Sequence, residues 1–122
     1  MNPPVLSLPH RSSLPPPPPR FSQLSAPQQR LVRLMQRVNF GRLENLVIRG
    51  GQPDFDPPPR VVCEIKFAGE NGPRPEEQAT DFTLKEQLID LLAHLDQLKN
   101  ASVEVLTVKH GLPFSMNVEA NA

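Results

Sequence analysis

The chain lacks several features that mark common classes of protein. It has no tryptophan and no tyrosine among its 122 residues, and it has six phenylalanines. Few rings are therefore available to stack on nucleic-acid bases. The 13 basic and 13 acidic residues give a formal net charge of zero. The chain thus lacks the strongly basic balance of a dedicated nucleic-acid-binding protein.

The single cysteine, Cys63, excludes a disulfide within the chain. It lies in an alternating apolar stretch, a pattern that favours a reduced core residue in a reducing compartment. No apolar run approaches the length of a membrane span. The N-terminus has no basic region followed by an apolar core, so we expect no signal peptide and a cytoplasmic location.

The balanced charge is unevenly distributed along the chain. Every charged residue between positions 30 and 42 is an arginine, whereas positions 70 to 96 hold seven acids and two bases. We interpret these regions as two solvated helix faces; alternatively, they steer self-association or a charged partner. The candidate basic patch on the first helix consists of Arg30, Arg33 and Arg37.

Residues 1–24 have the composition of a disordered, proline-rich tail. Five consecutive prolines, Pro15 to Pro19, favour an extended polyproline II segment without internal hydrogen bonds. The segment has too little apolar surface to form a core. Its predicted role is that of a tether or spacer. The alternative is a ligand for a proline-recognising groove, oriented by Arg20.

Residues 25–122 show the periodicities of an α+β domain built from two units, 25–68 and 81–120. In the first unit, a capping box from Ser25 to Gln28 begins a helix with apolar residues at helical spacing. A β-prone stretch from Leu43 to Arg49 follows, and Gly50-Gly51 suits a tight turn. The returning strand is delayed by DFDPPP and then alternates from Arg60 to Phe67.

The second unit follows a polar loop and has the same order of elements. Thr83 to Glu86 forms another predicted capping box, and leucines recur at helical spacing behind it. A strand, a His110-Gly111 turn and a last strand from Phe114 to Glu119 complete the unit. At an offset of 60 residues, RLENLVIRGGQP aligns without a gap with SVEVLTVKHGLP, and the two helices align in the same register. We interpret this as an internal α-β-β repeat.

The repeat predicts a topology. Each second strand begins at a proline, which is tolerated at strand starts and sheet edges, so the first strands are expected in the centre. A four-stranded antiparallel sheet in the order 2-1-3-4 follows, with both helices on one face and a pseudo-two-fold axis between strands 1 and 3. The face expected under the helices carries Leu46, Ile48, Val61, Cys63, Ile65, Leu106, Val108, Phe114 (or Leu112), Met116 and Val118.

The other sheet face is the candidate partner or dimer surface. Strict alternation places an apolar strip there, within a polar rim. The residues we expect in this interface are Leu43, Val47, Val103 and Val105. The alternative is an ordinary exposed sheet face with β-branched residues that favour strands.

A helix followed by FGRLENLVIRGGQP, within residues 28–67, resembles the YezD-type family of very small bacterial proteins. The resemblance implies a bacterial protein that is soluble and not secreted, and it brings no catalytic residues with it. The chain departs from that family by the DFDPPP insertion, the second unit and the proline-rich tail.

The stretch PDFDPPPRVVCEIKF spells the PD…(D/E)xK signature of metal-dependent nucleases, with Asp54, Glu64 and Lys66 as candidate catalytic residues. Such chemistry needs acids that converge on a divalent cation beside a lysine. Against this reading, Asp54 adjoins DPPP, where regular strand is disfavoured, and Glu64 and Lys66 have an ordinary outward place in an alternating strand. The signature is also short and degenerate.

No pattern indicates a cofactor, and no histidine has metal-ligand spacing to another histidine or to Cys63. The sequence therefore favours a non-catalytic module that binds a protein partner or self-associates, away from membranes. The alternatives are a metal-dependent nuclease of PD-(D/E)xK type and nucleic-acid binding through the basic first helix. Nucleic acid is the less favoured partner because the second helix is acidic.

Overall fold

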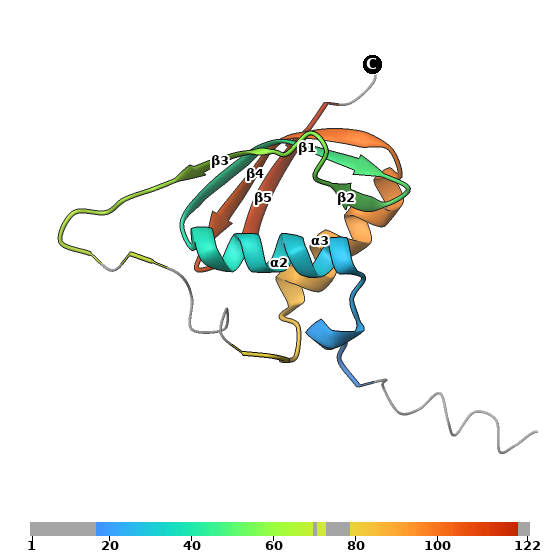
Figure 1. Ribbon diagram of the computed structural model, residues 1–122, viewed down its shortest axis with the longest axis horizontal. Helices are drawn as coiled ribbons and strands as arrows, with labels where there is room; N and C mark the ends of the chain where they lie inside the picture. The colour runs from blue at the N-terminus through green and yellow to red at the C-terminus, as the bar shows by residue number, and fades with distance from the viewer. Residues whose placement is uncertain (1–16, 70, 73–78, 120–122) are drawn as a thin grey trace, which may run out of the picture.

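Two helices cover one face of a five-stranded sheet in this computed structural model, which describes residues 17–69, 71–72 and 79–119 (Figure 1). This arrangement confirms the α+β class with a mostly antiparallel sheet. The elements in chain order are the 3-10 helix η2 (Phe21–Gln23), α2 (Ala26–Val38), β1 (Gly41–Arg49), β2 (Gln52–Asp54), β3 (Arg60–Cys63), α3 (Glu86–Leu98), β4 (Ala101–Lys109) and β5 (Leu112–Val118).

The sheet has the order β2-β1-β4-β5, and β3 pairs with β1 along the same edge as β2. The predicted four-stranded sheet is therefore corrected, because its second strand is two short strands. β2 lies against the end of β1 at Val47 to Arg49, and β3 lies against its beginning at Gly41 to Glu44. The residues between them include three prolines, which have no N–H to donate to a ladder, so this stretch leaves the sheet.

Both central strands depart from strict alternation at the same place. In β1 the buried residues are Leu43, Leu46 and Ile48, so one extra residue separates the first two. Asn45 supplies that residue, with a positive φ of 59°. Its counterpart in β4 is Glu104, beside a register shift against β5. Glu104 forms a β-bulge against β5, whereas Asn45 lies opposite Glu104 without a register shift. Each extra residue returns the next side chain to the same face.

These extra residues correct the predicted faces of the sheet. Leu43 and Val103, expected on the uncovered face, are 0% exposed and lie in the core under the helices. Val61, Cys63 and Ile65, expected under the helices, are exposed, as is Phe114. The residues of the expected core that do lie in it, or pack against it, are Leu46, Ile48, Leu106, Val108, Leu112, Met116 and Val118.

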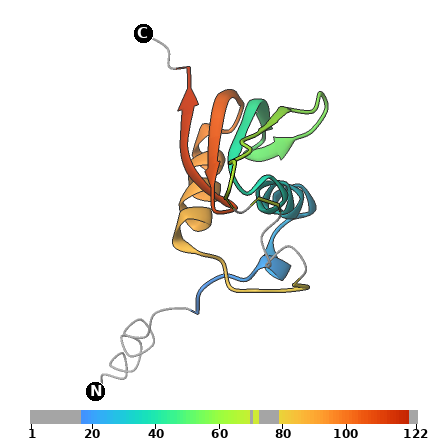
Figure 2. The same cartoon turned by 90° about the vertical axis from the view of Figure 1, so that its left-hand side faces the viewer.

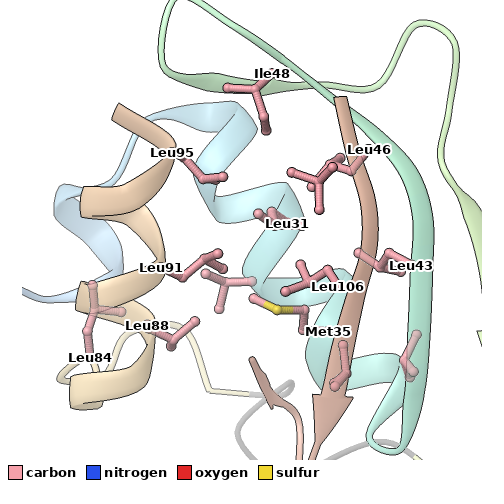
Figure 3. Close-up of a cluster of buried hydrophobic side chains, with 14 of the residues drawn as sticks. Leu31, Met35, Leu43, Leu46, Ile48, Leu84, Leu88, Leu91, Leu95 and Leu106 are labelled. Carbon is pink, nitrogen blue, oxygen red and sulfur yellow. The ribbon is translucent and has the colours of Figure 1, made fainter. Parts of the chain in front are cut away.

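The core fills the space between the helices and the sheet. Leu31 and Met35 of α2 face Leu91 and Leu95 of α3 above the buried strand residues (Figure 3). Burying one such side chain stabilises the fold by about 1.5–3 kcal/mol relative to leaving it in water. The predicted capping box at the start of α2 is confirmed: Ser25 Oγ accepts from the Gln28 N–H, and Gln28 Oε1 accepts from the Ser25 N–H.

The second predicted capping box is wrong. α3 begins at Glu86, and its N-cap residue, Lys85, makes no capping hydrogen bond through its side chain. Thr83 instead bridges to Arg20, whose Nη1 donates to Thr83 Oγ1 at 3.2 Å. Leu84 is buried in the core, and its N–H donates to Pro19 O. The residues just before this helix are therefore engaged with the N-terminal segment.

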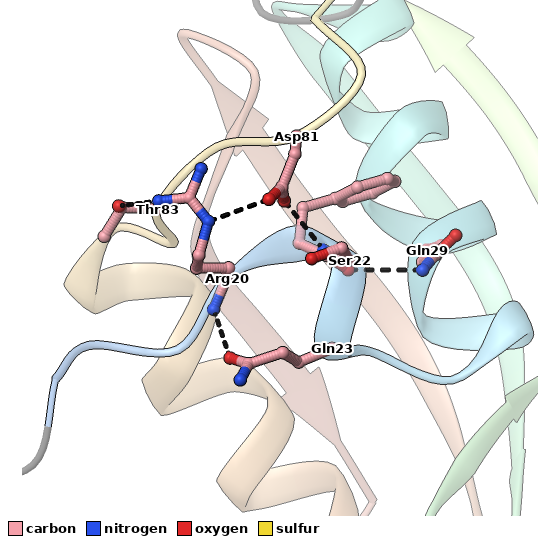
Figure 4. A network of polar contacts seen from close by, with 7 residues as sticks. Arg20, Ser22, Gln23, Gln29, Asp81 and Thr83 are labelled. Carbon is pink, nitrogen blue, oxygen red and sulfur yellow. Dashed lines mark hydrogen bonds and ion pairs between the residues drawn. The ribbon is translucent and has the colours of Figure 1, made fainter.

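The same contacts correct the predicted boundary between tail and domain. Residues 1–16 lie outside the described part, but Phe21 is buried and its ring stacks on Phe82 with centroids 5.0 Å apart. Arg20 Nε donates to Asp81 Oδ2 at 2.7 Å, and the Ser22 N–H donates to Asp81 Oδ1 at 2.9 Å (Figure 4). Residues 20–24, assigned to the tail from composition, thus belong to the fold.

We expect Asp81→Asn to lose less stability than the wild type when the pH is lowered. The hydrogen bond from Arg20, followed by that from the Ser22 backbone, lowers the pKa of Asp81 from 3.8 to about 2. A carboxyl group with a depressed folded pKa stabilises the fold above its unfolded pKa, and this stabilisation disappears as the pH falls through the folded value. The Tm difference between wild type and Asp81→Asn should therefore shrink as the pH falls from about 4 to about 2.

Thermal denaturation followed by circular dichroism, at steps from pH 6 down to pH 2, measures this difference. Asp90→Asn removes the same formal charge from an exposed site on α3 and serves as the control. A Tm difference for Asp81→Asn that stays constant over the whole range would contradict the assigned linkage.

The helix and the first strand of each half have matching bounds. Each bound of α3 and β4 equals that of α2 and β1 plus 60. The helices end in matching conformations, with φ values of 63° at Asn39 and 61° at Lys99. Each turn then bonds to the other half: the Gly51 N–H donates to Lys99 O at 2.8 Å, and the Gly111 N–H donates to Asn39 O at 2.9 Å.

Candidate protein-interaction surfaces

The face of the sheet away from the helices is more polar than predicted. Arg42 Nε donates to Glu44 Oε2 at 2.7 Å, and Arg60 Nη1 lies 3.6 Å from Glu44 Oε1. The hydrogen bond from Arg42, aided by the charges of both arginines, lowers the pKa of Glu44. Because Leu43 and Val103 are buried, only Val47 and Val105 of the expected interface lie on this face, both half-buried. The predicted apolar strip is therefore broken.

The residues of the nuclease signature are held apart. Asp54 pairs with Val47 near the end of β1, and its Oδ2 lies 2.6 Å from Arg49 Nε. Glu64 lies beyond the other end, where its N–H donates to Phe40 O. The intervening six or seven strand residues place the two acids about 20 Å apart. Such acids cannot share a cation.

Lys66 stays near Glu64, with Nζ 3.9 Å from Glu64 Oε1, and it also lies 3.8 Å from the centroid of the Phe40 ring. The pair thus forms part of a surface contact beside the start of β1. Within the described residues, no group of three or more histidine, cysteine or acidic residues is placed to hold a metal ion.

The arginines of the candidate basic patch contact aromatic rings and neighbouring segments. The Arg33 guanidinium lies 4.1 Å from the Phe21 ring centroid, and it donates to Gln36 Oε1 and to Ala79 O. Arg30 lies 4.3 Å from the centroid of Phe55. Through these contacts, Arg33 joins the N-terminal segment to α2, and Arg30 joins the proline-containing loop to α2. The third member, Arg37, is exposed.

β5 forms one edge of the sheet, and no described strand pairs with its outer side (Figure 2). Its seven residues, LPFSMNV, include no charged side chain. Proteins commonly protect exposed edges with charges, prolines or bulges, because unpaired N–H and C=O groups accept another strand. Pro113 lies at the beginning of β5, where a register shift against β4 also leaves Phe114 without a Cα partner. From Ser115 to Val118 the edge has neither a charge nor a proline. This absence of charge is visible in the sequence, but it has meaning only once β5 is known to be an edge.

A groove of about 320 Å³ runs between β5 and α3. Its floor is apolar, with Leu91 from α3, Leu106 from β4 and Met116 from β5. Asp90 and His94 lie on its rim, where His94 Nδ1 is 3.3 Å from Asp90 Oδ1. At its mouth, the side chain of Phe114 is 64% exposed. The groove thus combines an apolar floor, a polar rim and an open strand edge.

A second surface lies at the opposite edge of the sheet, in β3 and the four residues after it. This segment, residues 60–67, is called the arm below; its final residues extend away from the helices in Figure 1. Its alternate residues Val61, Cys63, Ile65 and Phe67 are all exposed, Ile65 by 69% and Phe67 by 94%. The sequence predicts this alternation, but the helix expected to cover these four residues does not lie over them.

The chain matches no model of a protein family, no curated protein and no solved structure. The resemblance of residues 28–67 to the YezD-type family therefore stays a prediction. No helix within the described ranges combines the length and apolar character needed to cross a membrane.

Proposed function

We propose that this chain is a non-catalytic protein-interaction module that accepts an extended segment of a partner protein along β5. The observation that carries the proposal is the uncharged outer edge of β5 beside an apolar groove. A strand added to such an edge gains main-chain hydrogen bonds along its length. Its alternate side chains then point towards the groove, which supplies specificity.

The residues of the groove define the chemistry of the partner segment. Leu91, Leu106 and Met116 offer space for one aliphatic or aromatic side chain. Asp90 stands on the rim with its side chain largely exposed, so it favours a lysine or arginine in the bound segment. An extended peptide with alternating apolar residues and one flanking base fits both features.

The exposed Phe114 supports the same role. An aromatic side chain at the centre of an interface gives a large contact area at low entropic cost, and it becomes useful only when a partner covers it. Lys109 Nζ lies 3.8 Å from the Phe114 ring centroid, which orients the ring beside the groove.

We further interpret the two α-β-β units as an internal repeat related by a pseudo-two-fold axis between β1 and β4. The reciprocal bonds between each turn and the other unit's helix end support this interpretation. In such an arrangement the edge formed by β2 and β3 corresponds to β5. The DFDPPP insertion divides the first of these edges into two short strands, whereas β5 is a single strand of seven residues.

The experiment uses a phage-displayed library of random twelve-residue peptides selected against the full chain. We expect selected peptides to share alternating apolar residues with a nearby base. In ¹H-¹⁵N spectra they should shift the signals of β5 and α3. Phe114→Lys adds a charge to an exposed position of the edge and should weaken binding of those peptides by about tenfold or more, because it blocks the edge without disturbing the core.

Val62→Lys, on the opposite edge of the sheet, is the matched control and should bind the peptides as the wild type does. Selected peptides that shift signals elsewhere, or that bind Phe114→Lys as tightly as the wild type, would overturn the proposal.

A further inference from the structure

We propose that the arm, residues 60–67, pairs antiparallel with the arm of a second copy of this chain around a two-fold axis at Ile65. The proposal concerns the edge opposite β5 and does not depend on peptide binding there. Its starting point is the exposed apolar face of the arm. Ile65 and Phe67 present large apolar side chains to solvent, and such patches commonly mark contacts with another protein.

The backbone of the arm is ready to pair on its outer side. The Glu64 N–H donates to Phe40 O at 2.8 Å, so residue 64 turns its backbone towards β1. Lys66 exchanges hydrogen bonds with the side chain of Asn71 through both its N–H and its C=O. Because backbone direction alternates along an extended chain, Cys63 and Ile65 direct their N–H and C=O groups to the opposite side, where no described strand pairs with them.

The charges of the arm favour one register. With Ile65 opposite its own copy, Glu64 of each chain faces Lys66 of the other. Opposite charges across a strand pair are favourable, and like charges are unfavourable. A register centred on Glu64 places that acid against itself, and one centred on Cys63 places Arg60 against Lys66. The sequence of the arm is therefore self-complementary around Ile65.

This arrangement forms a dimer and does not extend to further copies. A two-fold contact uses the same surface on both chains, so neither arm is left to recruit a third copy. Pairing satisfies the outward backbone groups of Cys63 and Ile65, and it brings the apolar side chains of the two arms together on one face. A second copy thus pairs with the unpaired edge of the arm and covers its exposed apolar residues.

The first test is the dimer dissociation constant, measured by analytical ultracentrifugation over a concentration series. Glu64→Lys and Lys66→Glu each create two like-charge pairs and should raise this constant by about tenfold. The double variant Glu64→Lys/Lys66→Glu restores both pairs and should return it to within about threefold of the wild type. Circular dichroism controls for folding, since both side chains are exposed.

Crosslinking then tests the register. In the variant Cys63→Ser/Ile65→Cys, the two introduced thiols face each other with Cα atoms about 5.5 Å apart, within the range of a disulfide. The wild-type Cys63 residues would lie about 14 Å apart in this register. Copper-phenanthroline oxidation should therefore link the variant and leave the wild type unlinked on a non-reducing gel.

Three results would overturn the proposal: a wild type that stays monomeric at every concentration, a double charge variant as weak as the single ones, or a wild type that links through Cys63 more readily than the Cys63→Ser/Ile65→Cys variant links. Peptide binding at β5 is measured separately and is unaffected by any of them, so failure of one proposal leaves the other intact.

Discussion

Replacing Gly41 by alanine should cost at least about 3 kcal/mol of unfolding free energy, more than an ordinary surface substitution by several-fold. Gly41 begins β1 with φ +157°, and a Cβ atom there would lie 2.1 Å from Val62 O. That oxygen belongs to the backbone of β3, so it cannot rotate away as a side chain does. The strand pairing at Gly41 and Cys63 must open instead. Urea denaturation followed by circular dichroism measures the effect.

Gly50→Ala is the matched control for this experiment. Gly50 has φ +59°, a conformation that L-residues adopt at a cost, but no atom lies within 4 Å of a built Cβ. We expect a loss of about 1–2 kcal/mol from the backbone conformation alone. His110, at the corresponding position of the second turn, carries a side chain at φ 56°. Equal losses at Gly41 and Gly50 would show that β3 does not approach β1 as described.

Val103→Asp should unfold the protein or nearly so, with a loss of about 4 kcal/mol or more. Val103 is fully buried between the sheet and the helices, where no described cation lies beside it to pair with a carboxylate. Small domains have only about 5–15 kcal/mol of total stability, so one unpaired buried charge removes much of it. Urea denaturation and the dispersion of ¹H-¹⁵N signals report the loss.

Val105→Asp provides the comparison, since it lies only two residues away. Without the bulge at Glu104, Val103 and Val105 would share a face and respond alike. Val105 is instead half-buried on the polar face, so we expect a loss of about 1 kcal/mol. Similar losses for the two variants would contradict the bulge and restore the strictly alternating strand.

The sequence determined the class of fold and the main elements, because these depend on local patterns. Apolar residues at helical spacing predicted both helices, and the Ser25 capping box marked the start of α2. At the offset of 60 residues seen in the sequence, the bounds of α2 match those of α3 and the bounds of β1 match those of β4. The helical spacing reflects the period of the backbone, and a capping box joins residues three apart, so neither depends on distant contacts.

The candidate site depended on features that local patterns do not contain. Asn45 and Glu104 are ordinary residues in the sequence, and only the assembled sheet makes them the extra residues that place Leu43 and Val103 in the core. Likewise, the composition of residues 20–24 resembles the tail, but Phe82 and Asp81, about sixty residues away, hold them in the fold. Which residues are buried is decided by such distant partners.

The same reason applies to the two proposed surfaces. Part of each could be predicted from the sequence, and the rest depended on the tertiary structure. The uncharged stretch of β5 and the alternating arm are both visible in the sequence. Tertiary structure decided that β5 lies at an edge beside a groove and that α2 leaves Ile65 and Phe67 uncovered. An apolar strand residue is buried or exposed according to which helix reaches it, and that reach is a property of the assembled sheet rather than of any one segment.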